Sequence, residues 1–183
     1  MSVSDVLKEM EGRFKKSIES ARADFATLRT GRANPAILDG VRAEYYGQQM
    51  PLSQLATIAV PEARQLLITP YDKATMALIE KAIIKSDLGL TPNNDGQAIR
   101  INIPQLTEER RKEFVKQLHQ KAEGARVSLR NIRRDANEQF KRDEAVTDDE
   151  AKRAEKDVQK LLDRYILELD TLQKSKEAEL LEV

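Results

Sequence analysis

Three long stretches of the chain repeat apolar residues every three or four positions, the spacing of one face of an α-helix. They cover residues 3–29, about 107–142 and 150 onward, and charged residues fill the remaining faces. Helices with one narrow apolar stripe can bury it only against each other. The sequence therefore predicts a bundle of three long helices. The expected core residues are Val3, Leu7, Met10, Phe14, Ala21, Phe25 and Leu28; Phe114, Leu118, Ala122, Ala125, Leu129, Ile132, Ala136 and Phe140; and Ala151, Ala154, Val158, Leu161, Tyr165, Leu169 and Leu172.

Local signals mark where these helices start and stop. Gly31 can take the left-handed conformation that ends a helix, and Thr107 can cap the start of the next one. Thr147 and Glu150 have the spacing of a capping box, in which each side chain binds the other's backbone N–H. A polar break at residues 143–149 separates the last two helices.

Residues 30–106 have a different texture, because all six prolines lie there. Short β-rich runs separated by turn signals predict strands at residues 41–46, 57–60, 65–69 and 98–103, with turns at 47–48 and 93–96. An amphipathic helix is expected at 73–86, burying Met76, either Ile79 or Leu78, Ala82 and Ile83.

The predicted fold class is α+β, with a long three-helix bundle interrupted by an inserted small β/α/β domain. Residues 1–29 and 107–183 would form the bundle, and residues 30–106 the inserted domain. Two connecting segments, near 30–34 and 104–106, would join them, and a double connection of this kind allows bending more readily than free tumbling.

Composition excludes several classes of function. The chain has no Cys and a single His, His119, so neither a disulfide framework nor a zinc site is expected. Its longest apolar run, residues 76–79, is far shorter than the ~20 residues of a membrane helix. No nucleotide-binding glycine motif is present, so no cofactor is expected. Without a signal or targeting segment before the first helix, we expect a cytoplasmic protein.

A formal net charge of zero conceals a strongly basic segment. Residues 110–134 contain nine basic and two acidic residues, a net charge of +7. Projected at about 100° per residue, most of the basic residues form a ridge beside the apolar stripe, interrupted by Glu123. The basic residues of this ridge are Arg111, Lys112, Lys116, Arg126, Arg130, Arg133 and Arg134. The ridge is richer in Arg than in Lys, which favours forked contacts with phosphate. Because no aromatic residues interleave with it, we expect recognition of nucleic-acid backbone rather than base stacking.

Other interpretations remain open. A charge run on a long helix is usually a solvated face, and the acid-rich last helix could supply partners for it. The bundle could also be a protein–protein adaptor without an RNA role. An enzyme in the α+β domain is possible, but no motif supports it.

Several motifs resemble bacterial ribosome recycling factor, and the similarity runs essentially end to end. The segments that carry it are LRTGRANP at 28–35, EYYG at 44–47, SDLGL at 86–90, LTEERRK at 106–112, NIRRDAN at 131–137 and KEAEL at 176–180. The resemblance implies an L-shaped pair of domains, a bundle and a β/α/β domain joined by a hinge. It also implies a non-enzymatic translation factor, and we expect the protein to be a monomer. Such a factor binds the post-termination ribosome through rRNA of the large subunit. With elongation factor G and GTP it splits the subunits, so that mRNA and deacylated tRNA leave.

The family's RNA-contacting arginines match Arg111, Arg130 and Arg133, with Arg29 as a further candidate. Arg29 could instead stabilise the end of its helix, where cations are favoured. Arg126 and Lys112 join these candidates because they lie on the ridge. The hinge of the family matches Thr30, Gly31 and Arg32 with Pro104, Gln105 and Leu106. The family commonly has a second Pro where this chain has Gln105, so we expect a looser hinge.

Overall fold

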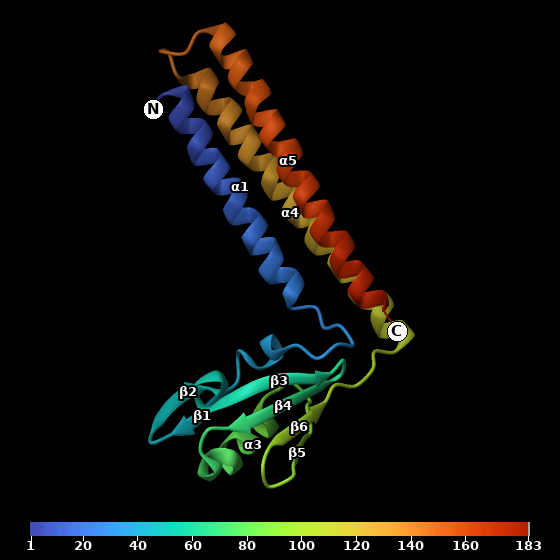
Figure 1. Cartoon of the computed structure of the whole chain (residues 1–183). Coiled ribbons are helices and arrows are strands. Elements are labelled where there is room, and N and C mark those ends of the chain that lie inside the picture. The colour runs from blue at the N-terminus through green and yellow to red at the C-terminus, as the bar shows by residue number, and fades with distance from the viewer. Residues whose placement is uncertain (183) are drawn as a thin grey trace. The chain divides into compact units, whose positions relative to one another are not determined.

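The computed structural model describes residues 1–182 and divides the chain into two compact units. One unit combines Met1–Arg29 with Glu108–Glu182, and the other is Thr30–Thr107. Figure 1 shows the long helices of the first unit and the small sheets of the second. The predicted α+β architecture with a long helical bundle is confirmed.

The first unit is built from three long helices, which pack along one another (Figure 1). They are α1 (Val3–Ala26), α4 (Glu108–Arg142) and α5 (Asp148–Leu181). Their apolar stripes meet in one continuous core, in which Phe14 stacks on Tyr165 with ring centroids 5.4 Å apart. Most of the predicted core is buried or packed against it. In two places the fully buried residue is the neighbour of the predicted one. Val6 and Leu162 are buried, whereas the predicted Leu7 and Leu161 are only partly buried.

The capping box predicted at the start of α5 is present. The Thr147 side chain accepts from the Glu150 N–H, and the Glu150 carboxylate accepts from the Thr147 N–H at 2.9 Å. The backbone bond from Thr147, followed by the bond from its hydroxyl, lowers the pKa of Glu150. This cap therefore stabilises the helix at neutral pH and is lost as the pH falls through that lowered pKa. A second capping box, Ser2 with Asp5, starts α1.

The second unit contains, within the described residues, a hairpin and a four-stranded antiparallel sheet. The hairpin pairs β1 (Arg42–Tyr45) with β2 (Gln48–Pro51). The sheet has the order β3-β4-β6-β5. Its strands are β3 (Ala56–Glu62), β4 (Gln65–Pro70), β5 (Pro92–Asn94) and β6 (Ile99–Asn102). Short helical segments are η1 (Pro35–Leu38), α2 (Leu52–Leu55) and η2 (Lys73–Thr75), and α3 spans Met76–Lys85.

The core of this unit lies between α3 and one face of the sheet. Side chains at alternate positions of a strand point to the same face, so Leu66 with Ile68, and Ile99 with Ile101, are fully buried together. They share one cluster with Met76, Ile79 and Ile83 of α3. Of the two residues left open by the sequence, Ile79 is the buried one and Leu78 is exposed. Ala82 was predicted to be buried, but it is only partly buried.

The β1–β2 turn lies one residue earlier than predicted. Its two central residues are Tyr46 and Gly47, both with positive φ (50° and 77°), as a two-residue hairpin turn with the twist of its strands requires. Gly47 adopts a positive φ without steric strain because it has no Cβ atom, whereas the same conformation is energetically unfavourable for Tyr46. The Tyr46 side chain is 88% exposed and contacts the ring of Tyr45 edge-on.

Candidate nucleic-acid interface

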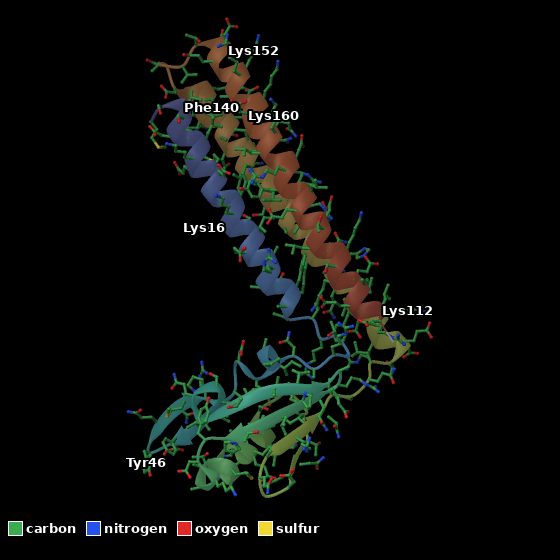
Figure 2. All side chains as sticks on the ribbon, viewed as in Figure 1. Lys16, Tyr46, Lys112, Phe140, Lys152 and Lys160 are labelled. Carbon is green, nitrogen blue, oxygen red and sulfur yellow. The ribbon has the colours of Figure 1, made fainter. Side chains whose placement is uncertain are left out.

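The basic ridge of α4 is held in place by the burial of the adjacent apolar stripe of that helix. Leu118, Ala122, Leu129 and Ala136 are fully buried, which fixes the rotation of α4 about its axis. The basic side chains then lie at the border of the core or in solvent, as the helical projection predicted. Figure 2 labels Lys112, which lies in the first turns of this helix.

Arg126 differs from the other ridge residues, because its side chain is bound within the bundle. Only 19% of it is exposed. The guanidinium donates to Asp170 of α5 at 2.7 and 3.2 Å and also to Gln173, and Glu123 lies at 3.5 Å. The acid-rich last helix thus supplies a partner, as the solvated-face interpretation allowed. These contacts favour a role for Arg126 in holding α4 against α5.

We expect Arg126→Ala to destabilise the bundle by about 1–3 kcal/mol, because it leaves Asp170 and Gln173 without their charged donor. Binding to ribosomes, measured well below the unfolding transition, should change less than twofold. Denaturant unfolding and co-sedimentation with ribosomes measure the two effects separately. A large loss of binding at unchanged stability would show that Arg126 is itself a contact residue.

Arg130 and Arg133 lie on α4 with less internal pairing. Arg130 is half exposed and donates to Glu123, itself exposed, at 3.1 Å. Arg133 donates to a neutral partner, Gln159 of α5, at 2.9 Å, so its charge is not neutralised there. Their neighbour Arg134 is exposed and forms no ion pair within residues 1–182. The structure thus brings these three arginines together at one part of α4.

The remaining candidates lie toward the other end of the same unit. Lys112 is 75% exposed and lies 3.3 Å from Glu108. An exposed ion pair of this kind is screened by solvent and contributes little to stability. Arg111 is partly buried, and its Nε atom is buried with no hydrogen-bond partner. It precedes Arg130 by 19 residues, or about 28 Å along the helix. Arg29 is exposed just beyond the end of α1. The candidate residues are therefore spread along the unit and do not form a compact site.

A groove between α4 and α5 adds residues that the sequence analysis did not include. It has a volume of about 810 Å³, and Arg130, Arg133 and Arg134 of α4 line it together with Lys152 and Lys156 of α5. Projection of α4 alone could not reveal the two lysines, because their position depends on how α5 packs. The acid-rich composition of the last helix also pointed away from them.

Neither a metal centre nor a membrane span is found in the described residues. No cluster of three or more His, Asp or Glu side chains there could hold a metal ion. None of the helices between residues 1 and 182 is apolar enough over 18 residues to cross a bilayer.

Comparison with known proteins identifies the family. The family model for ribosome recycling factor matches residues 21–181 of the chain. The chain belongs to the ribosome recycling factor family. The ribosome-recycling factor of Carboxydothermus hydrogenoformans is 53% identical over 184 residues, covering 99% of this chain and all of that protein. The Bacillus subtilis factor is also 53% identical, over 182 residues and 98% of each chain.

Solved structures of the family share the fold. A solution structure of a ribosome recycling factor matches with a TM-score of 0.82 and 43% identity, covering 100% of this chain and 99% of the other. In a second structure, the T. thermophilus ribosome recycling factor and the E. coli elongation factor G are bound to the E. coli post-termination complex. That recycling factor matches with a TM-score of 0.67 and 45% identity over the full length of both chains.

Proposed function

We propose that this chain is a ribosome recycling factor in action as well as in family. It binds the post-termination ribosome and, with elongation factor G and GTP, splits it into subunits, releasing mRNA and deacylated tRNA. Similarity over nearly the full length of curated recycling factors carries this proposal. The related complex with elongation factor G on the post-termination ribosome supports the choice of partners. The protein acts as a translation factor and not as an enzyme, in the cytoplasm and as a monomer.

The surface that binds large-subunit rRNA is the basic side of the bundle. Arg133 and Arg130 are its centre, since both are accessible and neither is neutralised by a buried carboxylate. Arg111, Lys112 and Arg29 extend the surface toward the other end of α4. Arg126 lies within it and contributes mainly by fixing α5 against α4.

The hinge comprises Thr30, Gly31 and Arg32 together with Pro104, Gln105 and Leu106. A Cβ atom added to Gly31 would lie 4.0 Å from the backbone nitrogen of Leu106, so the two connecting segments run close together. None of these six residues belongs to a helix or strand. Bending at these segments would let the small domain rotate under a push from its partner. The bundle would stay rigid and transmit the force.

We expect Gln105→Pro to slow subunit splitting while leaving ribosome binding unchanged. A second proline after Pro104 fixes φ near −65° and restricts the backbone of the preceding residue, so the segment becomes stiffer. Splitting rate and affinity are measured on the same preparation by light scattering and co-sedimentation. A splitting rate equal to that of the unmodified protein would show that this segment is not where bending limits the reaction.

Binding to the large subunit tests the proposed surface. The protein is pelleted with purified large subunits between 50 and 200 mM salt, in steps, and the bound fraction is measured. Counterion release predicts that affinity falls linearly with salt on a double logarithmic scale, with a slope of roughly −0.7 to −0.9 per phosphate contacted. Binding that is insensitive to salt would instead favour a protein–protein adaptor.

A further inference from the structure

The groove between α4 and α5 contains a concentration of positive charge that its surroundings neutralise only in part. Its basic lining comes from both helices and consists of Arg130, Arg133, Arg134, Lys141, Lys152 and Lys156. Only two carboxylates, Glu138 and Glu155, line it with them. Lys152 is labelled near the end of the bundle where the chain passes from α4 to α5 (Figure 2).

Internal pairing accounts for part of this charge, since Arg130 lies 3.1 Å from Glu123 in an exposed ion pair. Lys141 lies 3.9 Å from Glu155 with 71% of its side chain exposed, a weak pair, while Glu138 is paired with Arg142 at 3.8 Å. Arg134, Lys152 and Lys156 form no ion pair with any residue from 1 to 182. Crowded like charges repel one another, so an anion entering the groove would relieve an unfavourable interaction.

One polar side chain that lines the groove lacks a hydrogen-bond partner. Asn137 lines it, and its side-chain oxygen is buried without a hydrogen-bond partner. An unpaired buried acceptor is costly and uncommon in native proteins. Arg133 and Gln159 bond to each other across the groove, whereas this amide oxygen of Asn137 is left without a partner.

The lining chemistry selects the class of partner. Every residue lining the groove is polar or charged, and none is aliphatic or aromatic. The centre of a protein–protein interface is usually apolar, and base stacking requires aromatic side chains. Three arginines and three lysines instead suit phosphate oxygens. From Arg130 to Lys141 the α4 side extends about 16 Å, long enough for several consecutive phosphates.

We propose that this groove binds a run of phosphodiesters of an RNA backbone, with Lys152 and Lys156 of α5 as contact residues opposite the arginines of α4. The inference rests on the proposed function, because it extends the rRNA-binding surface from α4 onto α5. The α5 lysines then set part of the affinity and of its salt dependence, although α5 as a whole is rich in acidic residues.

The test compares two double variants of α5. Lys152→Ala/Lys156→Ala removes two charges from the groove, and Arg153→Ala/Lys160→Ala removes two exposed charges from the same helix outside it. Affinities for large ribosomal subunits and for protein-free large-subunit rRNA are measured across a salt series, and circular dichroism checks helix content. We expect the groove variant to bind both probes about 3- to 30-fold more weakly. Its salt slope should be reduced by about 1.4–1.8, whereas the control variant should match the unmodified protein.

Three results would overturn the inference, each for a different reason. If the unmodified protein does not bind subunits at all, the proposed function fails and the inference fails with it. If the protein binds with a steep salt dependence but the groove variant matches the control, the rRNA surface stands and the groove is not part of it. If the groove variant loses affinity for intact subunits but not for protein-free rRNA, the groove binds an acidic protein segment rather than RNA.

Discussion

Replacing Arg133 by Glu is expected to weaken binding to large ribosomal subunits by about 10- to 100-fold. A charge-assisted hydrogen bond to phosphate contributes about 1.5–3 kcal/mol, and the substituted carboxylate would also repel the backbone. The fold should survive, because the Arg133 side chain is only partly buried and its internal partner, Gln159, has a second bond to Asp163. The slope of log affinity against log salt concentration should become shallower by the contribution of about one or two phosphate contacts.

Lys16→Glu is the matched control for this variant. Lys16 is exposed on α1 and outside the groove, and it undergoes the same reversal of charge (Figure 2). We expect its binding to stay within about twofold of the unmodified protein, since distant exposed charges are screened by salt. Equal losses in the two variants would mean that binding responds only to net charge, and the assignment of Arg133 would be wrong.

Phe14→Ala should have the largest effect on stability, lowering the free energy of unfolding of the bundle by about 3–5 kcal/mol. The Phe14 ring is fully buried at the meeting point of the three helices and stacks on Tyr165. Truncation leaves a cavity that three nearly parallel helices cannot close without shifting along their length. Because native domains are stable by only about 5–15 kcal/mol, much of the margin would be lost.

Denaturant unfolding followed by circular dichroism measures this change, since most helical residues lie in α1, α4 and α5. Phe14→Leu is the conservative comparison and should cost less than Phe14→Ala, because a leucine side chain leaves a smaller cavity. A loss below 1 kcal/mol for Phe14→Ala would contradict the packing of the core around this ring.

Helices with strong periodic patterns were predictable from the sequence, whereas two strands were not. The boundaries of α4 and α5 follow from their stripes and from the capping box at Thr147. By contrast, β2 and β5 read QQMP and PNN and contain no β-branched or aromatic residue. They are strands because β1 and β6 offer them hydrogen-bond partners. Pairing of this kind is a tertiary effect that local propensity does not encode.

The candidate interface was predictable in outline but not in its pairing. The helical periodicity of α4 predicted that the arginines lie beside the core, because the position of a residue relative to the apolar stripe depends on one helix alone. Whether Arg126 meets Asp170, or Arg133 a neutral Gln159, depends on the register between two helices. The same register brings Lys152 and Lys156 to the groove. Contact roles for the ridge residues and bending at the hinge segments stay predictions that the proposed experiments test.

The most direct test of the account is a sucrose-gradient assay of post-termination ribosomes with this protein, elongation factor G and GTP. We predict that subunits separate only when all three are present, and that Arg133→Glu restores the intact ribosome peak at limiting factor concentration. Ribosomes that stay intact with all three components present, at concentrations where the protein is bound, would contradict the proposed function. Splitting that proceeds equally well with Arg133→Glu would contradict the proposed rRNA surface.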